Sequence, residues 1–178
     1  DFDANALDAR HQWRFRTRAW AKLTVGGSTD LAFGLANESK KWTTPKLALT
    51  LDETVFETLY LEHRFADGAS LRVGRQNISR GDGFLLTDGG PLDGSRTAYF
   101  NAVVAAQAWK DSRLDFMVVS NPARDRYLPP VRDQHKSLVE QDETAMGLYW
   151  SGPTPCKVGT ADLYAYFIER GVSILREK

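Results

Sequence analysis

The sequence predicts an all-β fold: an antiparallel meander of about eight strands that forms part of a large transmembrane outer-membrane β-barrel. Three observations carry this prediction. Apolar and polar residues alternate in runs of about ten residues, all prolines and most glycines fall between those runs, and short and long connections alternate. A strand that crosses a bilayer needs about 9–11 residues, and alternating segments of this kind are typical of transmembrane barrels.

We place the strands in the runs between the proline and glycine positions, because proline removes a ladder donor and glycine favours turns. The eight ranges are 11–25, 29–37, 53–65, 70–78, 96–109, 113–121, 143–151 and 161–170. The short connections are 26–28, 66–69 and 110–112, with a somewhat longer one at 153–159. The long connections are 38–52, 79–95 and 122–142. The repeat is one of architecture, since no short motif recurs with it.

The first strand shows the clearest alternation, and period two is the strand signature. One side carries Trp13, Phe15, Thr17, Ala19, Ala21, Leu23 and Val25, and the other carries Arg14, Arg16, Arg18, Trp20 and Lys22. The same period recurs in 29–37, 96–109 and 113–121. It favours strands with one apolar and one polar face.

Two stretches also suit a helix, 46–62 by its leucine spacing and 98–109 by its alanine content. We assign strands there because β-branched and aromatic residues are interleaved and the hairpin rhythm requires them. In the third strand, Glu57 falls on the same side as Leu59 and Leu61. A charge on a lipid-facing surface costs about 2–4 kcal/mol for a basic residue at midplane and less for an acid near the interface. We therefore expect Glu57 to be tolerated near a strand end.

The charges balance overall, with 23 basic and 23 acidic residues, yet residues 10–22 hold five basic groups and no acid. In a barrel, Arg14, Arg16, Arg18 and Lys22 would line the lumen. Unpaired buried charge costs several kcal/mol per ion, so that lumen must hold water or many carboxylates. A wide barrel fits this better than one of eight strands, whose interior is filled by side chains. Such a wall attracts carboxylates. The alternative is the solvated face of a soluble sheet.

A second basic group lies within Leu71-Arg72-Val73-Gly74-Arg75-Gln76. Simple alternation puts Arg72 and Gln76 on the lumen side and Arg75 on the apolar side. Arg75 would reach the lumen only through a bulge, for which Gly74 is a suitable site. Tight backbone packing at Gly74 is the other interpretation, and the sequence leaves both open.

Other classes of function lack support in the sequence. Balanced charge argues against a generic nucleic-acid binder, and the single Cys156 excludes an internal disulfide framework. No catalytic, P-loop or zinc motif occurs, and His11, His63 and His135 are scattered. The Asp- and Gly-rich loop 79–95 could hold calcium, but it lacks the EF-hand spacing and ordinary turns are preferred. We therefore expect no enzyme activity, no metal and no cofactor.

Several motifs resemble the alginate-export outer-membrane porin family. They run through Asp52-Glu53-Thr54-Val55-Phe56-Glu57-Thr58-Leu59-Tyr60-Leu61, Val73-Gly74-Arg75-Gln76, Gly81-Asp82-Gly83 and Gly94-Ser95-Arg96-Thr97-Ala98-Tyr99-Phe100-Asn101. The resemblance is firmest over 52–121. It implies a barrel of about eighteen strands, with an arginine-rich lumen that passively exports an anionic uronate polymer. Arg75 is the residue that the resemblance assigns to the pore.

Eight strands are fewer than half of such a barrel, and the chain ends Leu175-Arg176-Glu177-Lys178 without a terminal aromatic residue. We therefore expect 1–178 to be a single incomplete domain, the N-terminal part of a larger barrel. The expected function is an outer-membrane diffusion pore for anionic solutes, such as alginate or another uronate polysaccharide. Its expected partners are these anions, outer-membrane lipid and periplasmic export proteins. The alternative is a soluble or small-barrel protein that binds an acidic ligand.

Overall fold

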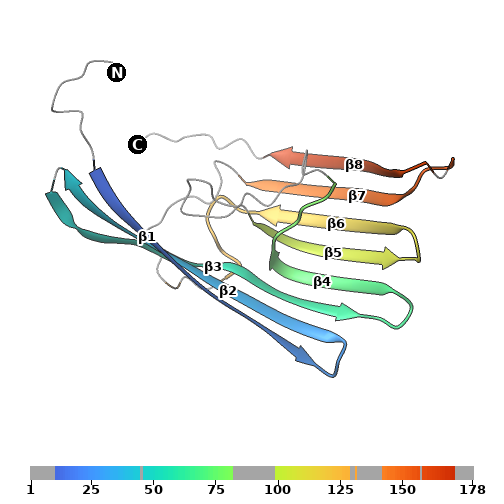
Figure 1. Ribbon diagram of the computed structural model, residues 1–178, viewed down its shortest axis with the longest axis horizontal. Coiled ribbons are helices and arrows are strands. Elements are labelled where there is room, and N and C mark those ends of the chain that lie inside the picture. The colour runs from blue at the N-terminus through green and yellow to red at the C-terminus, as the bar shows by residue number, and fades with distance from the viewer. Residues whose placement is uncertain are drawn as a thin grey trace, which may run out of the picture.

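The computed structural model describes residues 11–44, 46–81, 99–128, 131, 142–156 and 158–170, with the backbone alone at 46–47 and 50–53. These residues form eight strands (Figure 1). The strands are β1 (His11–Val25), β2 (Thr29–Thr44), β3 (Lys46–Arg64), β4 (Ala69–Gln76), β5 (Phe100–Ala108), β6 (Arg113–Asn121), β7 (Glu143–Pro153) and β8 (Thr160–Arg170).

All eight strands belong to one antiparallel sheet, in which each strand pairs with its neighbours in the chain. The order is β1 to β8, so β1 and β8 form the two edges of the described sheet. All eight predicted strands are confirmed, including the two helix-compatible stretches, which became β3 and β5 because both of their edges are paired. No helix among the described residues is long and apolar enough to cross a membrane.

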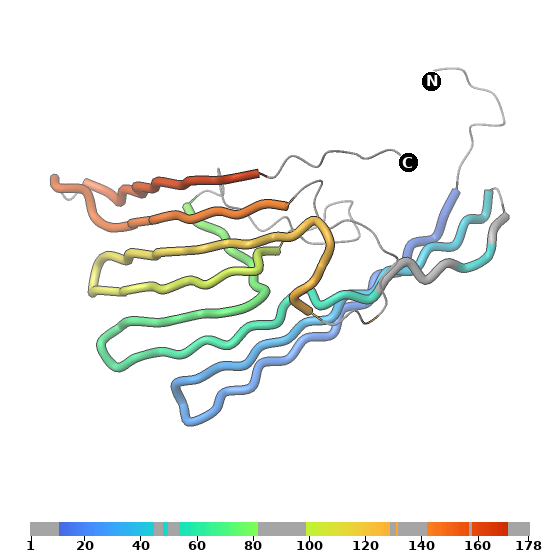
Figure 2. Tube along the Cα trace, turned by 180° about the vertical axis from the view of Figure 1, so that it is seen from behind, coloured from blue at the N-terminus to red at the C-terminus, as the bar shows by residue number. Residues whose placement is uncertain are grey.

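The predicted long connection at 38–52 is wrong. β2 continues to Thr44 and β3 begins at Lys46, so only residue 45 separates them. The polar residues in between keep pairing, with Lys41 opposite Leu49, although the register shifts along this stretch. Polar strand ends resemble a loop in sequence, which explains the error. The three long strands extend beyond β4–β8 at one end of the sheet (Figure 2).

The face of Glu57 is a second correction. Gly34 lies opposite Thr58 and Leu35 lies opposite Phe56, so Glu57 is an extra residue in β3. Such a bulge changes which way the following side chains point. Glu57 therefore leaves the side of Leu59 and forms an ion pair with Arg18, with Nη2 and Oε1 3.0 Å apart.

The sheet has two faces with different chemistry. The arginine face is the side that carries Arg14, Arg16, Arg18 and Lys22 of β1, together with their cross-strand neighbours. The apolar face is the opposite side, and its exposed side chains include Phe15, Leu23, Leu31, Phe33, Leu61, Leu71, Val73, Val103, Leu114, Phe116, Val118, Leu148, Leu163 and Phe167. Burial alternates accordingly: Asp115 and Met117 of β6 are buried, whereas Phe116 between them is 46% exposed.

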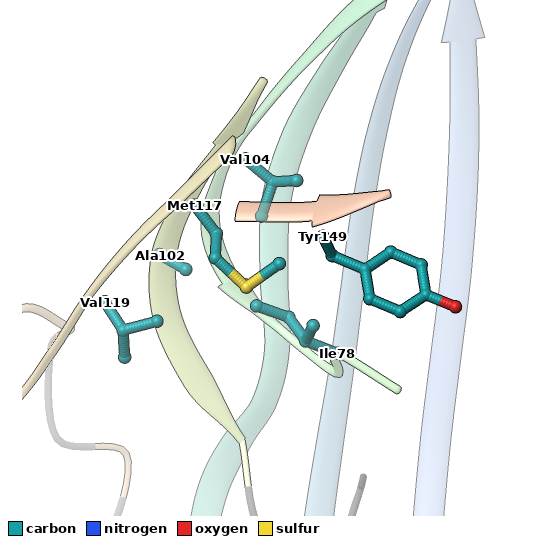
Figure 3. Close-up of a cluster of buried hydrophobic side chains, with 6 residues drawn as sticks. All are labelled: Ile78, Ala102, Val104, Met117, Val119 and Tyr149. Atoms are coloured by element: carbon teal, nitrogen blue, oxygen red, sulfur yellow. The ribbon is translucent and has the colours of Figure 1, made fainter. Parts of the chain in front are cut away.

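The buried core lies on the arginine face of β5–β8. After β4 the chain turns and residues 77–81 cross this face toward β7 (Figures 1 and 2). Ile78 is 1% exposed and packs among apolar side chains (Figure 3). Those side chains are Ala102, Val104, Met117, Val119 and Tyr149. The crossing segment, defined as 77–81, thus covers apolar residues that would otherwise face solvent.

Candidate functional site

The basic row on β1 meets its acidic partners on the neighbouring strand. Glu38 of β2 is 1% exposed, and its Oε1 lies 2.8 Å from Arg14 Nε and 3.1 Å from Lys40 Nζ. Its Oε2 lies 3.3 Å from Arg16 Nη2. β1 itself contains no acidic residue, and the acid that pairs with Arg14 and Arg16 comes from the neighbouring strand β2. One carboxylate therefore holds three cations.

A similar cluster lies near the tight turn between β1 and β2. Asp30 is fully buried, and its carboxylate binds Lys22 Nζ at 2.6 Å and the guanidinium of Arg64. Thr24 donates a further hydrogen bond at 2.7 Å. Lys22 and Arg64 keep 51% and 43% of their side-chain surface exposed. The carboxylate is thus enclosed while two cations reach the surface around it.

Arg72 lies on the arginine face, as alternation predicts. Its Nη2 donates to Glu62 Oε1 at 2.8 Å, and its guanidinium lies 4.8 Å from the centre of the Tyr60 ring. About a third of the side chain is exposed. Arg72 therefore joins the line of ion pairs that runs across β1–β4.

Arg75 and Gln76 do not line an open surface, since each is 1% exposed. The register through Gly74 is regular, so the proposed bulge is absent from β4. Gly74 instead has a φ of +127°, and a Cβ there would lie 2.3 Å from the carbonyl oxygen of Leu59. Tight backbone packing is therefore the interpretation that fits Gly74.

Arg75 instead joins several segments of the chain. Its Nη2 lies 2.7 Å from Asp125 Oδ2, in the connection after β6. Its Nε donates to Asn101 Oδ1 at 3.0 Å, and its guanidinium stacks 4.0 Å from the centre of the Tyr99 ring. Gln76 donates to the carbonyl of Ala102 at 3.1 Å. Both residues stabilise the end of β4 in this arrangement.

Four basic residues of the ion-pair clusters around Asp30, Glu38 and Asp115 were missed by sequence reasoning. Arg80 of the crossing segment and Arg113 of β6 both bind Asp115, which is fully buried. The third, Arg64, binds Asp30, and the fourth, Lys40, binds Glu38. Arg113 lies two residues before Asp115 in β6, so both side chains point to the same face beside a tight turn. This spacing could have identified Arg113 from the sequence. No comparable spacing identifies Arg80, because its position depends on the chain turning back after β4.

The arginine face therefore has two parts. Across β1–β4 it presents ion pairs in which cations remain partly exposed around buried carboxylates. Across β5–β7 it is mainly small or apolar and is covered by the crossing segment. Exposed cations around enclosed carboxylates favour the attraction of solute anions by weak, exchangeable contacts.

No group of three His, Cys, Asp or Glu side chains within the described ranges is placed to hold a metal ion. Most of the loop considered for calcium, residues 82–95, lies outside the described residues.

Comparison with known proteins adds no relative to this picture. No protein-family model, curated protein or solved structure matches the chain. The function is therefore argued from the two faces of the sheet and from the motifs in the sequence.

Proposed function

We propose that this chain is part of an outer-membrane β-barrel whose arginine face lines a diffusion pore for anionic solutes. The observation that carries the proposal is the apolar face. Large apolar side chains there are exposed on β1 through β8, with Phe15, Phe116 and Phe167 each about half exposed or more. Soluble monomers seldom expose apolar patches larger than about 300–600 Å². A face of this extent requires a cover, and acyl chains supply one.

Aromatic residues near the two ends of this face support a bilayer position. Phe65 and Trp109 are exposed beside tight turns, and Trp13 and Phe15 are exposed toward the other end of β1. From Trp13 to Val25 an extended strand rises about 40 Å. A tilt of about 40° reduces this height to the roughly 30 Å of a hydrocarbon core. Aromatic girdles at both interfaces are typical of such barrels.

Polar side chains on the apolar face form hydrogen bonds with one another. Asn37 Nδ2 donates to Thr54 Oγ1 at 2.8 Å, and the Ser39 hydroxyl donates to Asn37 Oδ1 at 3.3 Å. Polar groups in apolar surroundings are costly unless they are hydrogen-bonded. This row is therefore compatible with contact with lipid close to the interface.

The ends of the barrel follow from the lengths of the connections. The connections after β1, β3, β5 and β7 are tight and leave from one end of the sheet, whereas the long connections after β4 and β6 and the one-residue connection after β2 leave from the other. Outer-membrane barrels have short periplasmic turns and longer extracellular loops. The tight-turn end, with the Asp30 and Asp115 clusters, therefore faces the periplasm in this proposal.

The solute class follows from the arginine face and from the sequence motifs. Two cations on each of the buried carboxylates Asp30 and Asp115 leave a local excess of positive charge. Charge of one sign in a water-filled channel with low-dielectric walls concentrates the opposite ion. The motifs around Val73-Gly74-Arg75-Gln76, which are similar to those of the alginate-export porins, extend the proposal to uronate polysaccharides.

Ion selectivity of the full-length protein in planar bilayers tests this proposal. Arg18 and Glu57 form a suitable pair because both reach the surface of the arginine face. We expect Arg18→Gln to lower the anion-to-cation permeability ratio about two- to fourfold, and Glu57→Gln to raise it by a similar factor, as for one charge about 10 Å from the ion path in water, with the smaller effect at higher salt. The double variant should return near the wild-type ratio. A cation-selective pore, or a ratio that neither variant changes, would contradict the assignment.

A further inference from the structure

A pocket of about 370 Å³ lies on the arginine face of β6–β8, apart from the ion pairs of β1–β4. Its volume is within the range of about 300–1,000 Å³ that is usual for small-ligand sites. β6 contributes Met117 and Val119, β7 contributes Ala145 and Met146, and β8 contributes Tyr164, Tyr166 and Ile168. None of these lining residues is charged, and the two tyrosine hydroxyls are their only polar side-chain groups.

Two tyrosines form one wall of the pocket. The rings of Tyr164 and Tyr166 are stacked, with centroids 5.7 Å apart and an interplanar angle of 25°. Tyr166 lies over Gly147 so closely that a Cβ at 147 would be 2.1 Å from its Cδ1. Tyr164 is 49% exposed. The glycine therefore leaves room for one ring, that ring supports the second, and a flat apolar surface remains open to a ligand.

A methionine flanks the same glycine from the other side. The strand register puts Met117 of β6 and Tyr166 of β8 on either side of Gly147. Met117 is 1% exposed, so its side chain is fixed by packing. A thioether makes favourable contacts with aromatic rings about 5 Å away, and aromatic rings stack on one another. The lining therefore suits an aromatic ring.

The charges at one end of the pocket balance. They belong to Arg80, Arg113, Asp115 and Asp162. The two arginines share the carboxylate of Asp115, which interacts electrostatically with Tyr166. Asp162 lies on the pocket face of β8 and accepts a hydrogen bond from the Tyr149 hydroxyl. Two positive and two negative charges thus sum to zero beside the tyrosine wall.

The other end of the pocket is also neutral. Glu143 and Arg170 lie opposite each other beyond Ala145 and Ile168, with Arg170 Nε 3.1 Å from Glu143 Oε1. A charged ligand would lose its hydration in an apolar pocket. Among the described residues, neither end has a surplus of opposite charge to offset that loss. The charge balance therefore favours an uncharged ligand.

We propose that this pocket binds a small, uncharged aromatic molecule. The ligand ring stacks on the exposed face of Tyr164 and contacts the thioether of Met117. The inference goes beyond the proposed pore, because the site needs only the folded strands β6–β8 and no conduction of ions.

The test is ligand-detected fluorine NMR of the full-length protein in detergent micelles. The probes share one fluorinated ring and differ in charge: 4-fluorobenzyl alcohol is neutral, 4-fluorobenzoate is an anion and 4-fluorobenzylammonium is a cation. We expect the alcohol to bind with a Kd of about 1 mM, as for a ligand of about nine non-hydrogen atoms. Each ion should bind about tenfold more weakly, because its charge is desolvated.

Two substitutions separate the pocket from the rest of the surface. Ala145→Leu fills the pocket and should remove binding of the alcohol. Ala165→Leu is the matched control, because residue 165 lies between the two tyrosines but points to the apolar face, opposite Leu148. It should leave binding unchanged. Tyr164→Ala should weaken binding roughly two- to tenfold through loss of one ring contact.

Each other result overturns a stated part of the inference. Tighter binding of the anion would show that Arg80 and Arg113 dominate the site, and tighter binding of the cation would show that Asp162 does; either contradicts an uncharged ligand. Equal binding by the wild type and Ala145→Leu would place the probe outside the pocket. Displacement by cyclohexylmethanol as effective as by benzyl alcohol would contradict an aromatic ligand. All of these readouts are independent of ion conduction, so failure of the ring site leaves the pore standing, and absence of a pore leaves the ring site standing.

Discussion

At the scale of single residues, three buried carboxylates bind basic side chains of the arginine face. Asp30, Glu38 and Asp115 are each exposed by 1% or less, and each holds two or three basic side chains. Removal of a cation leaves a buried carboxylate less compensated, and removal of the carboxylate leaves two or three partly exposed cations beside one another. These acids therefore position the cations as well as neutralise them.

The Asp115 cluster gives a direct test of this role. We expect Asp115→Asn to lower the free energy of unfolding by about 1–3 kcal/mol, because Arg80 and Arg113 lose a charged partner. The measurement is the urea midpoint in lipid bilayers, read by tryptophan fluorescence. The control is Asp142→Asn, whose partner Arg126 and own side chain are both more than half exposed. Exposed pairs contribute about 0–1 kcal/mol, so equal midpoint shifts in the two variants would contradict the account.

The sequence predicted the basic row at this scale but not its partners. Alternation alone places Arg14, Arg16 and Arg18 on one face, because every strand has period two. The pairing of Arg18 with Glu57 depends on the bulge in β3, which changes the face of one residue. Arg75 was assigned to the pore from a motif, whereas its burial follows from contacts with Asp125 and Asn101 that are distant in sequence.

At the scale of strands, glycines allow neighbouring strands to make close contacts. The Tyr166 ring of β8 occupies the space above Gly147 of β7. We expect Gly147→Ala to lower the free energy of unfolding by about 1–3 kcal/mol, because the ring must move from a packed position. Gly34→Ala is the matched control, since its Cβ would meet Thr58 at an ordinary 3.4 Å. Comparable urea midpoints for the two variants would count against this contact.

Gly74 makes a different kind of contact, with backbone. Its φ of +127° is strained for any other residue, and a Cβ would meet the Leu59 carbonyl oxygen at 2.3 Å. We expect Gly74→Ala to destabilise the protein more than Gly147→Ala, because a carbonyl cannot rotate away as a side chain can. Removal of the ring by Tyr166→Ala should partly rescue Gly147→Ala and should not rescue Gly74→Ala. Rescue of both variants, measured by urea midpoint, would show that the two sites do not differ in this way.

Strand positions were largely predictable, and strand ends were less so. Gly26 and Gly27 mark the end of β1 and Pro122 marks the end of β6, and alternation alone marks where these two strands begin. The extension of β2 to Thr44 was missed because polar strand residues resemble loop residues. The crossing segment was missed because its position depends on Ile78 packing against β6 and β7, which no local pattern encodes.

At the scale of the whole molecule, the strands of the described residues form a single sheet with one apolar and one arginine face. Alternation predicted these two faces, because each side chain of a strand points opposite to the next. It could not predict that the arginine face is apolar and covered across β5–β7, since that division depends on the crossing segment. In the proposed barrel the two faces have different solvents, lipid on one side and water on the other.

The central claim is tested most directly by labelling adjacent residues of β1. With Cys156→Ser as background, a nitroxide is attached at position 21 or 22, where Ala21 lies on the apolar face and Lys22 on the arginine face. In bilayers, we predict that the label at 21 collides with lipid-soluble oxygen and is shielded from a water-soluble nickel complex, and that the label at 22 shows the reverse. Water accessibility at 21 with oxygen accessibility at 22, or equal accessibility at both, would contradict the account.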